Sequence, residues 1–298
     1  MHRFIVYQYG KVGSTAVVET LNTLPEVEAH QVHFFGPTAF EIIFNKLLDP
    51  ALSEYFFEHS SGQLLGNMRV YRQFRQARDK GERVTVLTMF REPFDWFRSC
   101  IAQEIDDHIN TFRYSLDRGG IAWDSDEEAV TLGLELLLTR ILGALELAGG
   151  IDNLSLEVRR GLNQTMAFAD DRDFEQFLFL LGRFLAPHFW FATNLRPALE
   201  TDLQDMERLS TDLFRAQKEW GNIYLMRYEQ LQGAFESALR DLGYADPPQL
   251  AHSNISAEKP FSDAINAVFA SPAAHKLKRL CQSETDRFLG YGSLRTPG

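Results

Sequence analysis

A glycine-rich segment near the start of the chain, YQYGKVGST (residues 7–15), has the residue types that hold an oxyanion. It follows a short apolar run and precedes a stretch with helical spacing, and a turn between a strand and a helix commonly binds phosphate or sulfate. Lys11 supplies a cation, Ser14 and Thr15 supply hydroxyls, and Gly13 lets backbone N–H groups approach a ligand. This combination suits a tetrahedral oxyanion without a metal. The alternative is an ordinary strand–helix turn with a solvated lysine.

A second group of polar residues follows the most β-branched segment of the chain, in TMFREPFDWFRSC. Arg91 comes directly after this segment, Pro93 suits the first position of a helix, and Ser99 lies farther along that helix. An arginine in such a turn can bind a phosphate through two parallel hydrogen bonds, and the serine can add a hydroxyl. These residues predict a second anion-binding position, and the alternative is an exposed arginine at a helix start.

The order of residues in the first loop differs from that in enzymes that hydrolyse ATP or GTP. Their loop has the pattern G-x-x-x-x-G-K-[ST], with the lysine after the second glycine. Here Lys11 precedes Gly13, and the strand ending at Phe90 is followed by Arg91 instead of a magnesium-binding aspartate. We also see no Cys/His cluster with metal-ligand spacing. These observations argue against a kinase-like enzyme and predict a site without a metal.

Both groups are expected to lie on an α/β framework. The hydrophobic pattern predicts strands at 3–8, within 26–37 and at 82–90, and helices at 14–24, 38–60, 67–80 and 93–105. Alternating strands and helices at this spacing indicate a parallel sheet. The expected fold class is therefore α/β, with a P-loop-like parallel sheet flanked by helices.

The chain changes character between about residues 106 and 220. Long helical patterns joined by polar turns predict a large helical insertion, which we expect to cover the substrate side of the sheet. A further strand is predicted in NIYLMRYEQL (222–231), followed by a helix that ends at Gly243 and a mixed tail. We interpret residues 1–298 as a single domain that carries this insertion.

The composition limits the class of protein. The net charge of −11 and the pI of about 5.2 argue against a nucleic-acid binder. Two cysteines make no disulfide framework and are typical of a reducing compartment. The start of the chain has no signal-peptide pattern, and the most apolar stretch, LGLELLLTRILGALELAGG, is too interrupted by charges to span a membrane. We expect a cytoplasmic protein, with peripheral membrane attachment left open.

Together the two groups resemble the motifs of sulfotransferases that use 3′-phosphoadenosine-5′-phosphosulfate (PAPS). In that family a loop like KVGST holds the 5′-phosphosulfate, and a motif R-[DE]-P-x5-S holds the 3′-phosphate; Arg91, Glu92, Pro93 and Ser99 match the latter. LMRYEQL resembles the family's RYEDL segment. The chain is similar in particular to bacterial capsular polysaccharide synthesis proteins, through YQ.GKVGST, HQVHF and FWFATNLRPALETDL. The resemblance covers both ends of the chain better than residues 106–185.

This resemblance implies a sulfotransferase fold and transfer of a sulfuryl group from PAPS to an acceptor hydroxyl, with PAP as product. The acceptor is expected to be a carbohydrate or a capsular or exopolysaccharide unit. The implied cofactor-binding residues are Lys11, Gly13, Ser14, Thr15, Arg91, Ser99 and Tyr228, the last near the adenine. Lys11 is also expected to be catalytic, because a cation beside the leaving phosphate oxygen stabilises the charge that grows there.

Transfer to a hydroxyl also needs a general base. We expect His33, at the end of the second predicted strand, to be this base; His30, Glu19 and the acidic group beginning at Glu104 are alternatives. In a strand, His30 and His33 would point to opposite faces, so that only one could face the site. A histidine satisfied at the edge of the core is the other interpretation of either one.

A basic stretch stands out in this acidic chain. Residues 69–91 hold seven cations and two anions, a local charge of +5. We expect Arg69 and Arg72 to face a site and the remaining basic residues of the helix to be solvated. Lys259 is a further candidate for the 3′-phosphate. Two other functions stay open: a kinase-like P-loop enzyme, which would need magnesium, and a non-catalytic module that binds sulfated or phosphorylated ligands.

Overall fold

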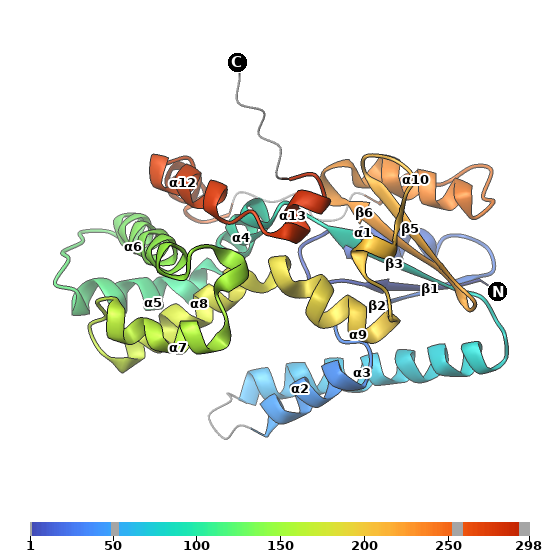
Figure 1. The fold of residues 1–298 in the computed structure, drawn as a ribbon, viewed down its shortest axis with the longest axis horizontal. Coiled ribbons are helices and arrows are strands. Elements are labelled where there is room, and N and C mark those ends of the chain that lie inside the picture. The colour runs from blue at the N-terminus through green and yellow to red at the C-terminus, as the bar shows by residue number, and fades with distance from the viewer. Residues whose placement is uncertain (1, 49–53, 252–258, 292–298) are drawn as a thin grey trace, which may run out of the picture. The chain divides into compact units, whose positions relative to one another are not determined.

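The computed structural model describes the chain apart from residues 1, 49–53, 252–258 and 292–298. Two compact units account for it: residues 1–91 with 189–255, and residues 92–188 with 256–298. The first unit contains the sheet and the second is helical (Figure 1). Within the described part of the chain, no helix combines the length and the apolar character needed to cross a membrane.

The first unit is built on a six-stranded sheet in the order β2-β1-β3-β6-β5-β4. Its parallel strands are β1 (His2–Tyr7), β2 (Val27–Val32), β3 (Val84–Phe90) and β6 (Gly221–Arg227). β5 (Leu213–Lys218) and β4 (Glu207–Arg208) extend the sheet in antiparallel pairing. β3 is buried along its whole length, as its continuous apolar run predicts for a parallel strand covered on both faces.

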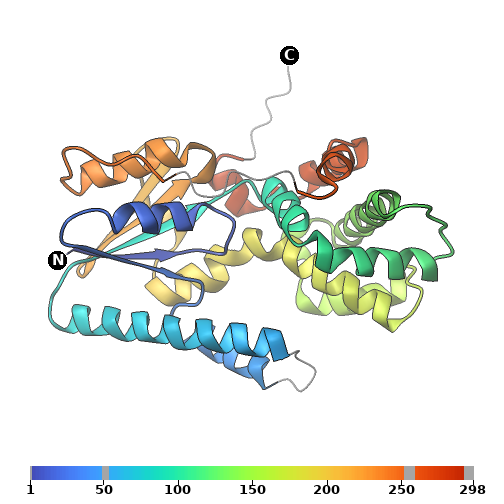
Figure 2. The same cartoon turned by 180° about the vertical axis from the view of Figure 1, so that it is seen from behind.

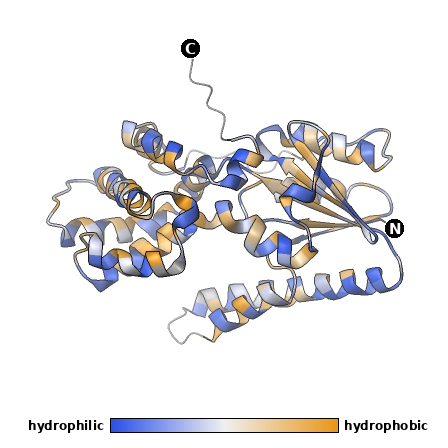
Figure 3. Ribbon diagram, in the orientation of Figure 1, coloured by the Kyte–Doolittle hydropathy of each residue, from blue (hydrophilic) through white to orange (hydrophobic). Residues whose placement is uncertain are grey.

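Helices cover both faces of this sheet (Figures 1 and 2). α1 (Ser14–Leu21) and α10 (Leu231–Asp241) pack on one face, and the long α3 (Glu54–Asp79) runs along the other. α2 (Pro37–Leu47) packs on α3 and on the short α9 (Arg196–Leu199). The strands are hydrophobic and α3 is largely hydrophilic (Figure 3), so only part of α3 packs tightly on the sheet.

The second unit consists of helices around its own hydrophobic core. They are α4 (Pro93–Gln103), α5 (Ile105–Arg118), α6 (Asp126–Ala148), α7 (Leu156–Thr165), most of α8 (Asp171–Trp190), α11 (Ser262–Phe269), α12 (Pro272–Leu280) and α13 (Glu284–Phe288). α6 packs against α5, α11 and α12. The rings of Phe184 and Phe269 both contact Phe97, which places aromatic packing at the centre of this unit.

The α/β class and the mainly parallel sheet predicted from the sequence are confirmed. Two local predictions were wrong. β4 and β5 lie inside the segment 106–220 that was expected to be helical, because both strands are short and are stabilised by antiparallel pairing with each other and with β6. α3 runs unbroken from 54 to 79 and includes Gly62 and Gly66, whereas separate helices were expected at 38–60 and 67–80. Each glycine costs a helix only about 1 kcal/mol, which its neighbours can offset.

Candidate functional site

The candidate site lies at the carboxyl ends of β1 and β3. The chain leaves β1 through α1 to β2, and then crosses through α2 and α3 to β3 on the opposite side of β1. In open α/β sheets, ligands bind outside the carboxyl ends of the strands at the point where the connections diverge in this way. The loop after β1 and Arg91 after β3 lie at this position.

The loop between β1 and α1 has an unusual backbone. Gly10, Lys11 and Gly13 have φ angles of 90°, 58° and 77°, all in the left-handed region. For a lysine this costs about 1–2 kcal/mol, and such strain clusters at functional sites. Gly13 is followed by the right-handed first turn of α1, and no described side chain caps that turn. Adjacent residues of opposite hand turn their N–H groups toward one concavity, which suits an anion.

Arg91 ties this loop to the end of β6. Its guanidinium donates to the carbonyl of Lys11 at 3.2 Å and lies 4.6 Å above the ring of Tyr228. Its backbone N–H donates to the hydroxyl of Tyr9 at 3.0 Å. Tyr228 also lies against Gly13, where an added Cβ would be 3.3 Å from the ring. The structure therefore brings together Lys11, Gly13, Arg91 and Tyr228, which come from three separate segments.

The remaining residues expected at the nucleotide are distributed differently. Ser14 is buried and Thr15 is exposed, both in the first turn of α1 directly after the loop. Ser99 is half-buried on α4 and Lys259 precedes α11, so both belong to the second unit. Of the residues expected at the nucleotide, the first unit thus contributes all except Ser99 and Lys259.

His33 follows β2 directly and is connected to the loop through Gln8. The backbone N–H of Gly10 donates to Oε1 of Gln8, and Nε2 of Gln8 lies 3.2 Å from Nδ1 of His33. Because Oε1 is taken by Gly10, the carboxamide presents its NH₂ group to the imidazole, so Nδ1 accepts. In the neutral ring the proton is then on Nε2. Nε2 of Gln31 lies 3.4 Å away and is itself a donor, so Gln31 accepts this proton only with its carboxamide turned over.

The surroundings of His33 keep its imidazole neutral. Burial lowers the pKa of His33 below the ordinary value of 6.5, and the nearby charge of His59 lowers it further. A histidine with a lowered pKa is unprotonated at neutral pH and can accept a proton. This is the protonation state that a general base needs.

The alternative bases have other partners or positions. Nε2 of His30 lies 2.9 Å from Oε1 of Glu28, and Oε2 of the same carboxylate accepts from Arg3. Glu19 is exposed on α1, and Glu104 pairs with Arg183 in the second unit. His33 therefore remains the histidine connected to the loop.

One expectation about the two histidines was wrong. His30 and His33 do not face opposite sides, because both line the same pocket beside α3. β2 ends at Val32, so the alternation of a strand does not extend to His33. Of the two arginines expected to face a site, Arg69 lines this pocket and Arg72 does not.

Two residues of the cluster were not singled out from the sequence. Gln8 is fully buried and bridges Gly10 and His33, and Tyr9 fixes the backbone of Arg91. A polar residue at the end of an apolar strand, immediately before a glycine turn, was the available signal for Gln8. Trp190 is buried, and its ring centroid lies 4.9 Å from that of Tyr7 and 5.5 Å from that of Tyr9. It therefore packs against the start of the loop.

The chain matches no known protein-family model, and neither a curated protein nor a solved structure was found to match it. Among the residues that the structure describes, no group of three or more His, Cys, Asp or Glu side chains could hold a metal ion. Any functional assignment therefore depends on the geometry of the loop, Arg91, Tyr228 and His33.

Proposed function

We propose that the protein is a PAPS-dependent sulfotransferase of the sulfotransferase fold that acts on a carbohydrate hydroxyl. One observation carries this proposal: the glycine-rich loop, Arg91 and Tyr228 contact one another at the carboxyl ends of the central strands. The loop offers backbone N–H groups and a lysine, and the other two residues offer a guanidinium beside an aromatic plane. This donor set suits a nucleotide that carries phosphates at two positions.

The residues present fit such a nucleotide in a defined way. Lys11, Gly13, Ser14 and Thr15 would hold the 5′-phosphosulfate at the start of α1. Arg91 would bind the 3′-phosphate, and the ring of Tyr228 would lie against the adenine. PAPS supplies an activated sulfuryl group: the acceptor oxygen bonds to sulfur while the bond between sulfur and the phosphate oxygen breaks, leaving its electron pair on the phosphate.

Two side chains of the first unit would act on this reaction. Lys11 would stabilise the negative charge that develops on the departing phosphate oxygen. His33 would take the proton of the acceptor hydroxyl, because its lowered pKa keeps it neutral. For Nε2 of His33 to accept this proton, Gln8 must release Nδ1. An anion bound by the N–H of Gly10 would compete for the bond that orients Gln8, which couples the loop to the base.

Two competing functions make different demands on the same residues. A kinase-like enzyme needs a carboxylate for magnesium at the end of a central strand, and the residue there is Arg91, after β3. A non-catalytic anion-binding module would need the loop and Arg91 but not a neutral histidine connected to that loop. The link from Gly10 through Gln8 to His33 therefore favours the enzyme.

The test is calorimetric titration with PAP in the absence of magnesium, on the wild type and on Arg91→Ala. We expect micromolar binding in the wild type and a loss of at least about 100-fold in the variant, because a buried bidentate phosphate contact contributes several kcal/mol. Arg72→Ala, an exposed arginine of the same unit, is the matched control and should bind normally. Absence of PAP binding, together with magnesium-dependent binding of ATP or GTP, would overturn the proposal.

A further inference from the structure

A polar pocket lies beside His33, between the end of β2 and α3. Its volume is about 520 Å³, within the range of roughly 300–1,000 Å³ that is typical of small-ligand sites. Four of its lining residues are carboxamides: Gln31, Gln63, Asn67 and Gln73. Val70 is the apolar side chain of the lining. The four carboxamides offer many hydrogen-bond donors and acceptors to a polar acceptor.

Two of these carboxamides have unmet hydrogen-bonding capacity. Asn67 is 5% exposed, yet its side chain makes no hydrogen bond with another described residue. Oε1 of Gln73 is buried and has no partner in the described part of the chain. A buried carboxamide without a partner costs about 1–3 kcal/mol. Both residues lie on the side of α3 that lines the pocket, where hydroxyl groups of a ligand would satisfy them.

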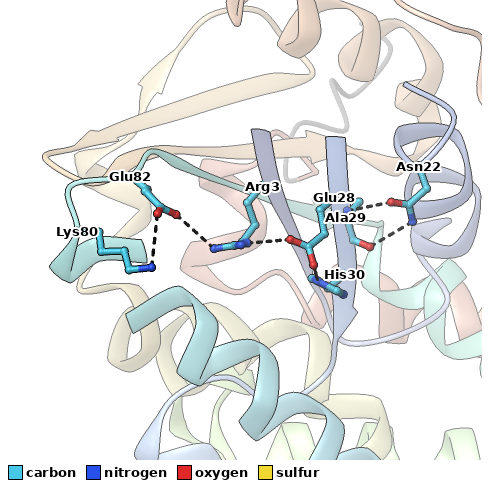
Figure 4. Close-up of polar contacts among 7 residues, drawn as sticks. All are labelled: Arg3, Asn22, Glu28, Ala29, His30, Lys80 and Glu82. Carbon is cyan, nitrogen blue, oxygen red and sulfur yellow. Dashed lines mark hydrogen bonds and ion pairs between the residues drawn. The ribbon is translucent and has the colours of Figure 1, made fainter. Parts of the chain in front are cut away.

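The charge of the lining favours an anion. Arg69 is exposed and has no ion pair with a described residue, and the lining contains no aspartate or glutamate. Glu28, the partner of His30, is also occupied by Arg3; Arg3 in turn pairs with Glu82, which also pairs with Lys80 (Figure 4). This chain of ion pairs neutralises Glu28 and fixes His30. Arg69 therefore remains available to a negatively charged ligand.

From this lining we infer that the pocket binds the acceptor as an acidic sugar, with its hydroxyls on Asn67 and Gln73 and its carboxylate on Arg69. The inference rests on the proposed function, since it takes the pocket beside His33 as the acceptor side of the reaction. A carboxylated pyranose combines the two features that the lining requires, hydroxyl groups in several directions and a single negative charge. An acceptor held there would lie against the imidazole that is connected to the loop.

The test measures saccharide binding without any nucleotide, so it does not depend on sulfuryl transfer. The probes are tetrasaccharides of galacturonate, glucuronate and mannuronate, the fully methyl-esterified tetragalacturonate, and tetraglutamate. At least one uronate should bind the wild type about 10-fold or more tightly than the neutral ester and than the peptide. Arg69→Gln should remove this preference and Arg69→Lys should restore part of it. Arg72 lies on the same helix but does not line the pocket, so Arg72→Gln should leave the preference for uronates unchanged.

A second variant separates the hydroxyl contacts from the charge. Asn67→Leu has nearly the same volume and should weaken the uronate and the ester by the same factor, since both keep their ring hydroxyls. The inference is overturned if no uronate binds, if the ester or the peptide binds equally well, or if Arg72→Gln acts like Arg69→Gln. Uronate binding without PAP binding would overturn the proposed function and support the acidic-sugar pocket. PAP binding without uronate binding would support the proposed function and overturn the acidic-sugar pocket.

Discussion

Each unit contains a cluster of polar side chains, and the two clusters differ in how far their hydrogen-bonding groups are satisfied within the protein. In the second unit Asp173 is fully buried and accepts from both terminal nitrogens of Arg140 at 2.8 and 2.7 Å, from Ser115 at 2.7 Å and from the backbone of Ala169 at 3.0 Å. In the first unit Oε1 of Gln73 is buried without a partner among the described residues, and Lys11 has a left-handed backbone.

The difference distinguishes a structural cluster from a ligand-binding one. The carboxylate of Asp173 has all its acceptor positions filled from within the protein, so it can stabilise only the fold. Along α3, the carboxamide of Gln73 keeps capacity that the described residues do not use. Changes in the Asp173 cluster should therefore affect folding without affecting binding, and changes in the loop and pocket should do the reverse.

The largest effect is expected for Asp173→Ala. It leaves the guanidinium of Arg140, which is largely buried, without its partner, and this should lower the free energy of unfolding by about 3–5 kcal/mol. Chemical denaturation measures the change. Ser115→Ala removes one donor to the same carboxylate and should cost only about 1 kcal/mol. PAP binding by the folded Asp173→Ala protein should equal that of the wild type; weaker binding at full folding would contradict the comparison.

Lys11→Ala should have the opposite pattern. We expect kcat for sulfuryl transfer to fall about 100- to 1,000-fold, as when one charge-stabilising group is removed from a transition state. PAP binding should change only a few-fold, and the free energy of unfolding should fall far less than in Asp173→Ala, because Lys11 is only half-buried. Lys80→Ala is the control, since Lys80 is an exposed lysine of the same unit. An equal loss of turnover in Lys80→Ala would show that general charge, and not position, matters.

The sequence was informative where chemistry and local structure coincide. KVGST and REP each lie between a strand and a helix, so their order along the chain was enough to predict the loop, Arg91 and the parallel sheet. Spatial neighbours that depend on where a strand ends were not predictable in this way. His33 lies one residue beyond β2, and this position sets it on the same pocket as His30. Likewise, the partners of Gln8 come from two different segments, 2 and 25 residues away in the chain.

Gly13→Ala should affect the loop more than Gly10→Ala does. Both glycines have a positive φ, so each alanine costs about 1–2 kcal/mol of stability. At Gly10 an added Cβ meets nothing within 4 Å, whereas at Gly13 it would be 2.7 Å from Cδ2 of Leu231 and 3.3 Å from Tyr228. Only Gly13→Ala should therefore displace Tyr228 and weaken PAP binding, by about 10-fold on the scale of one lost aromatic contact. Equal PAP affinities in the two variants would exclude a role for Tyr228 at the nucleotide.

The smallest expected change is a shift in pH dependence in Gln8→Glu. Burial gives His33 a pKa below 6.5 in the folded protein, so the acidic limb of kcat/KM should lie below pH 6.5. For the same reason His33 contributes stability that is complete above pH 6.5 and is lost as the pH falls toward the folded pKa. A carboxylate at position 8 would accept a proton from Nδ1 and favour the charged imidazole, which raises the pKa and moves the limb to higher pH.

Gln8→Leu separates charge from the loss of a hydrogen bond. It removes the contact with Nδ1 without adding a carboxylate, so the acidic limb should not move to higher pH. The Glu variant also fixes the proton on Nδ1 and leaves Nε2 able to accept one. It should therefore keep activity above the limb, whereas a merely structural Gln8 would lose activity at every pH. If the limb is the same in all three proteins, His33 is not the group whose ionisation controls turnover, and the base must be sought elsewhere in the first unit.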